Sequence, residues 1–174
     1  MMTRWIQRNP RWTWLAAVAS LLLMDQISKS YFSTALELGE AIQVTEWLNF
    51  VHVLNAGAAF SFLADAGGWQ RWFFIGVSVV VVGVVSVVCL ARQAEPLDRW
   101  LGAFVVGGGS GNLVDRIQIG AVVDFLDFHW RSIHWPAFNL ADVFIVSAAL
   151  TWCLFSLKAP PRVPTRKVTE EMRS

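Results

Sequence analysis

The feature that most constrains this chain is a run of twenty residues, 72–91, without a single charged side chain. A helix of about 20 apolar residues is what crossing a bilayer requires. Three further segments, 12–31, 100–117 and 138–157, have 18 to 20 residues each and are mostly apolar. We therefore predict an all-α membrane protein, residues 1–174 forming one domain with four transmembrane helices.

The composition agrees with a membrane protein. Hydrophobic residues make up 55% of the chain and charged residues only 16%, whereas soluble domains carry about a quarter charged residues. The ten tryptophans suit anchoring at membrane interfaces. A net charge of +1 without an internal basic stripe gives no reason to expect nucleic acid as a partner.

The first apolar segment has the flanks of a retained helix. Arg4, Arg8 and Arg11 precede it, as in a secretory signal peptide. However, its apolar run ends at Met24, and Asp25 and Lys29 follow this run in place of a small-residue cleavage site. We expect this segment to remain in the protein.

Basic residues predict the orientation. They gather before the first segment, between the second and third, and after the fourth, whereas the other two connections are mainly acidic. The basic set is Arg4, Arg8, Arg11, Arg92, Arg99, Lys158, Arg162, Arg166 and Lys167, and the acidic set is Glu37, Glu40, Glu46 and Asp65. The positive-inside rule then places both termini in the cytoplasm. The tail 159–174, rich in proline and charge, is expected to be disordered.

The two outer connections differ in pattern. Residues 33–68 contain alternating stretches at 41–45 and 48–54, which predict short strands in a small sheet over the outer helix ends. Residues 118–137 are predicted as an outer loop or loop/helix. The small residues around Gly57 would allow close approach of the backbone to a ligand.

Two acids stand out at the outer membrane level. Asp124 lies in an apolar run, and Asp142 opens the fourth segment three residues after Asn139, a spacing at which Asn139 can orient its carboxylate. Carboxylates at membrane depth mark functional sites. Two that share one proton can activate a water molecule against an amide bond.

Other polar residues fall at the same level. Asp25 and Lys29 are four residues apart and predict an ion pair, with Lys29 snorkelling outward and Asp25 either structural or supporting a site. On the third segment Asn112 and Arg116 are also four apart. Arg116 suits a substrate carbonyl or a lipid phosphate, or it pairs with Asp115 or another acid.

Two more expectations concern the same region. Gly107 and Gly111 form a small-xxx-small pair that favours close helix packing. Asp127, three residues after Asp124 in the outer connection, is predicted to be a solvated loop residue.

Several rival chemistries fit the residues less well. His52, His129 and His134 lack the spacing of a zinc site, so no metal or other cofactor is expected. Ser28, Ser30 and Ser61 raise a serine–lysine hydrolase, but the first two adjoin Lys29 and point away from it on a helix. Cys89 and Cys153 lie in apolar runs, and we expect no disulfide. A small proton-coupled transporter and a lipid-binding subunit remain as alternatives.

Five motifs occur in a fixed order along residues 12–158. They are DQISK (25–29), NAGAAFS (55–61), GGSGNLVDR (108–116), VVDF (122–125) and FNLAD (138–142). In this order they resemble lipoprotein signal peptidase, also called signal peptidase II, an aspartyl protease family of bacterial inner membranes. Gly109 and Ser110 depart from the residues common in the family.

The resemblance implies a substrate and a site. The family removes signal peptides from diacylglyceryl-modified prolipoproteins, cutting just before the lipid-modified cysteine, near the periplasmic face of the inner membrane. It implies Asp124 and Asp142 as the catalytic pair, without a cofactor. The supporting residues would be Asp25, Lys29, Asn55, Gly57, Gly108, Asn112, Arg116, Asn139 and Ala141. Membrane lipid surrounds the protein, globomycin-type inhibitors should bind, and we expect a monomer.

Overall fold

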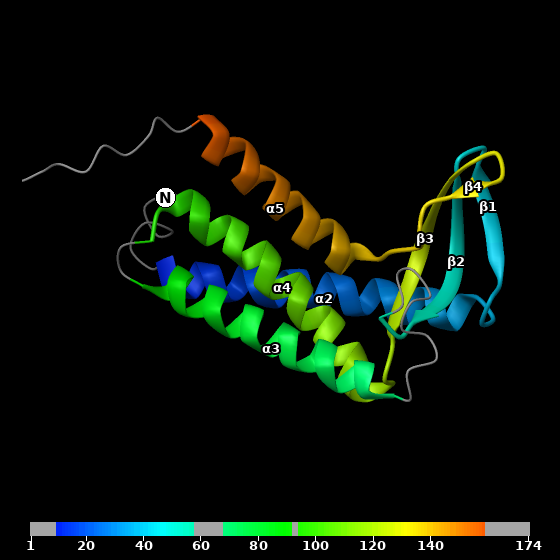
Figure 1. Ribbon diagram of the computed structural model, residues 1–174, viewed down its shortest axis with the longest axis horizontal. Coiled ribbons are helices and arrows are strands. Elements are labelled where there is room, and N and C mark those ends of the chain that lie inside the picture. Colours follow the sequence, from blue (N-terminus) through cyan, green and yellow to red (C-terminus); the bar gives the residue numbers. More distant parts are fainter. Residues whose placement is uncertain (1–9, 58–67, 92–93, 159–174) are drawn as a thin grey trace, which may run out of the picture.

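The structure, a computed structural model, describes residues 10–57, 68–91 and 94–158. It consists of four helices and a small sheet at one end of them (Figure 1). The helices are α2 (Pro10–Ala35), α3 (Trp69–Leu90), α4 (Pro96–Gln118) and α5 (Leu140–Lys158), and the strands are β1 (Ala41–Thr45), β2 (Leu48–Asn55), β3 (Val122–Trp130) and β4 (Ile133–His134). The predictions for the tail 159–174 and for Asp65, Arg92 and Ser61 lie outside the described residues.

Helix α4 is the centre of the bundle, since it packs against α2, α3 and α5 (Figure 1). Its glycines permit these contacts. A Cβ on Gly107 would lie 2.7 Å from the Cβ of Leu21 in α2, and one on Gly108 would lie 2.5 Å from the Ala141 carbonyl oxygen in α5. The predicted packing role of the small residues is confirmed. The buried apolar core beside them contains Trp14, Leu21, Cys89, Ala103, Val106 and Phe144.

Among the described helices, α3 and α5 are long and apolar enough to cross a membrane. Only 6% of the most apolar stretch of α3 is buried within the protein, and valines such as Val80 and Val87 are exposed. A core helix of a soluble protein would bury these side chains. The apolar surface of α3 therefore faces outward, as in a membrane helix.

The sheet has the order β1-β2-β3-β4 with antiparallel pairing. It packs on the last turns of α2 through Phe32, whose ring centroid is 4.7 Å from that of Phe50 in β2 and 4.5 Å from that of Phe125 in β3. In the register between β2 and β3, Val53 lies opposite Asp124. This pairing places Asp124 on a strand that is held on one side by β2 and at its base by α2.

Two element predictions were wrong in part. Residues 118–137 are not an outer loop or loop/helix, because β3 and β4 occupy most of the segment. Pairing with β2, a contact distant in sequence, determines that β3 is a strand. In addition, α2 continues through residues 33–35, which were assigned to the strand-like segment, and strands begin only at Ala41.

The close packing of α4 makes a testable prediction. A Cβ on Gly111 would collide with the carboxylate of Asp25, whereas nothing lies within 4 Å of a Cβ on Gly83 in α3. We expect Gly111→Ala to lower the free energy of unfolding by about 1–3 kcal/mol. Gly83→Ala should leave stability unchanged or raise it by up to about 1 kcal/mol. Thermal unfolding of both variants in detergent measures this, and equal effects would contradict the packing described here.

Candidate active site

A buried lysine joins α2 to α4. Lys29 is 3% exposed, and its Nζ lies 2.8 Å from Oδ2 of Asp25, 3.0 Å from Oδ2 of Asp115 and 2.9 Å from Oδ1 of Asn112. The predicted ion pair with Asp25 is confirmed. The prediction that Lys29 snorkels outward is wrong, because three acceptors on two helices surround its ammonium group within the protein.

The same two acids hold the elements that carry the candidate catalytic pair. Oδ1 of Asp25 accepts the backbone N–H of Ala141 at 2.9 Å, in the first turn of α5. Oδ2 of Asp115 accepts the backbone N–H of Val123 at 3.1 Å, near the start of β3. Thus Asp25 bonds to the start of α5, and the Lys29 cluster fixes where α5 and β3 begin.

Asp142 belongs to the cap of α5. Its backbone N–H donates to Oδ1 of Asn139 at 3.1 Å, and the N–H of Asn139 donates to Oδ2 of Asp142 at 3.3 Å. This is a reciprocal capping box, which satisfies free N–H groups at a helix N-terminus. Nδ2 of Asn112 donates to the other carboxylate oxygen of Asp142 at 2.9 Å. The carboxylate is half-buried, so it keeps an open side.

Asp124 is held more tightly and is 1% exposed. Nδ2 of Asn139 donates to its Oδ1 at 2.6 Å, and Nδ2 of Asn55 donates to its Oδ2 at 3.0 Å. Burial raises the pKa of Asp124 to about 6, the hydrogen bond from Asn55 opposes the rise, and the charge of Asp142 adds to it. Asn139 therefore joins the two acids, because its side chain donates to the carboxylate of Asp124 and forms the reciprocal helix cap with Asp142.

Residues at the edge of this site hold one another in place. Oδ1 of Asn55 accepts the N–H of Gly57 at 2.9 Å. Gly57 has φ 101°, and a Cβ there would collide with the ring of Phe74. The guanidinium of Arg116 lies 5.2 Å from the centre of the same ring and donates to the carbonyl of Asn112 at 3.3 Å. A side chain larger than hydrogen at position 57 would displace Phe74 from under Arg116.

Most of the predicted site residues meet here, with some corrections. Asp115 pairs with Lys29 rather than with Arg116 in the described part of the chain. Asp127 is not a solvated loop residue: it is buried, accepts from Asn49 at 2.9 Å and lies 2.9 Å from Nδ1 of His134. The sheet that buries Asp127 was only partly predicted, which explains the error.

Sequence reasoning missed the structural roles of Gln26 and Asp115. Nε2 of Gln26 donates to Oδ1 of Asp115 at 2.9 Å and to the Gly111 carbonyl at 3.2 Å. Helical spacing contained a signal, because Asn112 and Asp115 are three residues apart on α4, and residues at this spacing share a face.

The rival chemistries find little support in the described residues. They contain no group of three or more His, Cys, Asp or Glu side chains that could hold a metal ion. Lys29 is held by two acids, and the hydroxyl of Ser28 donates to the backbone carbonyl of Asp25 at 2.7 Å. Neither residue is arranged as a nucleophile or its base.

Comparison with known proteins decides the family. Residues 17–158 match the family described as Signal peptidase (SPase) II. The chain belongs to the signal peptidase II family. The matched range contains α3, α4, β3 and all of α5, together with all residues of the candidate site.

Relatives of this signal peptidase II family member agree. It is 48% identical over 143 residues to the lipoprotein signal peptidase of Aeromonas hydrophila, a match covering 80% of this chain and 83% of that protein. It is 44% identical over 161 residues to the lipoprotein signal peptidase of Shewanella amazonensis, covering 91% and 94%.

The fold is also shared with solved structures. A bacterial membrane enzyme determined by the in meso method at 2.3 Å resolution superposes with a TM-score of 0.76 at 23% identity, covering 91% of this chain and 95% of that one. A second, at 1.9 Å resolution, gives a TM-score of 0.75 at 24% identity, covering 86% and 96%. The chain therefore shares its fold with these two bacterial membrane enzymes.

The Lys29 cluster makes a prediction about stability. Lys29→Met leaves Asp25 and Asp115 buried without a cation, which should cost about 3–5 kcal/mol. Arg11→Met, at an exposed position of the same helix, should change stability by less than about 0.5 kcal/mol. Thermal unfolding in detergent measures both. Adding Asp115→Asn to Lys29→Met should recover part of the loss, and no recovery would argue against charge as its cause.

Proposed function

We propose that this protein is an intramembrane aspartyl endopeptidase in which Asp124 and Asp142 are the catalytic pair. Family membership makes it a peptidase that removes lipoprotein signal peptides. The aspartyl mechanism is supported by one observation above the others. Two carboxylates from different elements are tied together by Asn139, which donates to Asp124 and forms the cap with Asp142.

We further propose that all four helices span a bacterial inner membrane, with both termini in the cytoplasm. The apolar outer surfaces of α3 and α5 support this. The charged side chains of α2 and α4, such as Lys29 and Asp115, bond to one another inside the bundle, which lowers the cost of placing them at membrane depth. The sheet and the site then lie at the periplasmic face.

The substrate proposed is a diacylglyceryl-modified prolipoprotein, cleaved just before the lipid-modified cysteine. Its acyl chains would stay in the bilayer while the peptide enters sideways between helices. Asn55, Gly57 and Arg116 at the edge of the site would position the peptide, and Gly108 and Ala141 would keep α4 and α5 close behind it. Globomycin-type inhibitors would occupy the space between the aspartates of a monomer.

The environments of the two acids suggest different roles in hydrolysis. Asp124, buried and with its pKa raised to about 6, is the member that holds the shared proton. Asp142 accepts hydrogen bonds from Asn112 and from the backbone of Asn139, which stabilise a charged carboxylate.

The steps then follow as in general acid–base catalysis. Asp142 takes a proton from water, the oxygen attacks the scissile carbonyl, and Asp124 donates its proton to the carbonyl oxygen. The tetrahedral intermediate collapses when Asp142 returns a proton to the leaving nitrogen and Asp124 takes one from a hydroxyl. Both carboxyl groups regain their starting states. The rival reading as a proton-coupled transporter has no support from the comparisons.

The catalytic assignment is tested by isosteric substitution. Asp124→Asn and Asp142→Asn should each lower kcat by about 10³-fold or more, because general acid–base groups contribute about 10²–10⁴-fold. The assay is cleavage of a diacylglyceryl-modified prolipoprotein by purified protein in detergent. Asp127→Asn on the same strand is the matched control and should retain activity. Normal cleavage by either dyad variant would refute the pair.

The raised pKa of Asp124 predicts the pH dependence. As pH rises through about 6, Asp124 loses its proton, both acids become charged, and kcat/KM should fall. Asn55→Ala removes a hydrogen bond that holds this pKa down, so the descending limb should move to higher pH. The same sign applies to stability: the contribution of Asp124 is complete below pH 3.8 and is lost as pH rises through about 6. A profile unchanged by Asn55→Ala would contradict the assignment.

A further inference from the structure

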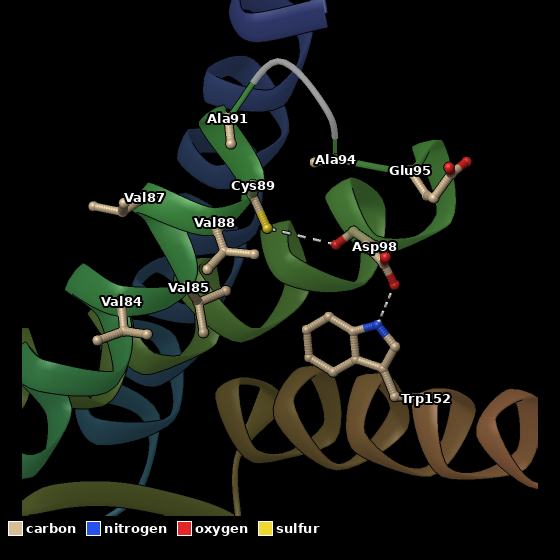
Figure 2. A pocket seen from close by; sticks show the side chains of 10 residues that line it. All are labelled: Val84, Val85, Val87, Val88, Cys89, Ala91, Ala94, Glu95, Asp98 and Trp152. Carbon is tan, nitrogen blue, oxygen red and sulfur yellow. Dashed lines mark hydrogen bonds between the residues drawn. The ribbon is translucent and has the colours of Figure 1, made fainter. Parts of the chain in front are cut away.

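A cavity of about 700 Å³ is lined by residues from the end of α3, the start of α4 and the later part of α5 (Figure 2). This end of the bundle lies away from the sheet (Figure 1). It forms where α3 ends and α4 begins, with α5 on its other side. Helices α3 and α5 both pack against α4, but they scarcely contact each other in the part of the chain that the structure describes. The lining residues used below are Val84, Val88, Cys89, Glu95, Asp98 and Trp152.

One wall of the cavity is apolar and another is acidic. Valines of α3 form the apolar wall, and Asp98 and Glu95 carry their carboxylates at its edge (Figure 2). Asp98 is half-buried, and its Oδ1 accepts the indole N–H of Trp152 at 2.8 Å. A neutral indole does not balance the negative charge.

The neighbouring cation points elsewhere. Arg99 donates from Nε to the carbonyl of Cys89 at 3.2 Å and from Nη2 to the carbonyl of Ala91 at 3.0 Å. It therefore caps the C-terminus of α3, where carbonyl groups lack helical partners. The described residues show no salt bridge to Asp98 or Glu95, so this end of the groove is suited to a ligand that brings its own positive charge.

The length of α4 relates this cavity to the site. Asp98 and Asn112 are 14 residues apart on one continuous helix, which corresponds to about 21 Å. A signal peptide has an apolar region of about 7–15 residues preceded by a positively charged n-region. As a helix the apolar region would span about 10–22 Å, so the longest such regions match the separation between Asp98 and Asn112 along α4.

We propose that this cavity binds the N-terminal part of the substrate's signal peptide, which consists of the basic n-region and the apolar segment after it. The apolar segment lies along the groove between α3 and α5, and the basic residues before it face Asp98 and Glu95. This inference rests on the proposed function and extends it to substrate selection. The enzyme then binds both ends of the signal peptide: the cleavage site at Asp124 and Asp142, and the basic end at Asp98 and Glu95.

The test uses two synthetic diacylglyceryl-modified prolipoprotein peptides that differ only in the n-region. One carries two lysines there and the other two glutamines. We expect wild-type protein in detergent to cleave the lysine peptide with a KM lower by about fivefold for each lysine, the size of an ion pair at an interface. The kcat values should be equal, because the n-region is far from the reacting atoms.

Neutral variants should remove this preference. Asp98→Asn keeps an oxygen that can accept the indole N–H of Trp152 but lacks the negative charge. Glu95→Gln likewise removes the negative charge at the exposed position 95. The double variant should cleave both peptides with the KM that wild type shows for the glutamine peptide. Asp98→Lys should reverse the preference toward a peptide with glutamates in the n-region. A preference for lysine that survives the double variant would overturn the proposal.

A size test separates the groove from charge alone. Val88 lines the cavity and is 57% exposed, whereas Val80 on the same helix is 63% exposed and does not line it. Val88→Trp should raise KM for both peptides by about tenfold, the effect of losing burial for part of an apolar segment. Val80→Trp should leave KM unchanged. Equal effects of the two tryptophans would count against the groove.

The outcomes distinguish this inference from the proposed function. If wild type cleaves both peptides with the same KM, the proposed peptidase stands and the docking of the n-region is refuted. If it cleaves neither, the proposed function itself fails. A lipid amine as the true occupant would give a different result. Without phosphatidylethanolamine the two peptides would have the same KM, and adding this lipid would raise the KM of the lysine peptide no more than that of the glutamine peptide.

Discussion

The arrangement of the site depends on one buried cation. Lys29 lies between Asp25 of α2 and Asp115 of α4, and each acid uses a further contact to hold a backbone N–H. One of these amides starts α5 and the other lies near the start of β3. Burying charges is unfavourable unless they are paired and hydrogen-bonded, and here the pairing also positions the two elements that carry the candidate catalytic acids.

The two acids are held by different local devices. Asp142 is part of a helix cap with Asn139, so its position follows from the start of α5. Asp124 lies on a strand, and its place follows from pairing with β2 and from the amides of Asn55 and Asn139. As a result Asp124 is buried and Asp142 is half-buried. This difference supports Asp124 as the proton donor and Asp142 as the base.

A sequence pattern could predict the parts of the site that rest on local spacing. The ion pair of Asp25 and Lys29 follows from a separation of four residues on a helix, and the pairing of Asn139 with Asp142 follows from a separation of three. The burial of Lys29 could not be predicted in this way. It requires Asp115 and Asn112 from a helix more than 80 residues later, and no local pattern contains that contact.

By itself the sequence determined the four apolar helical segments, the level at which polar residues collect and the family to which the motifs point. The segments and the polar level follow from composition and periodicity, which act within a segment, whereas the family follows from the resemblance of the ordered motifs. Only the tertiary structure decided that residues 122–130 form a strand, that Asp127 is buried beside His134, and that Asp124 is enclosed by two asparagines. Such outcomes depend on which surfaces meet, and the energies of pairing and burial arise only when they do.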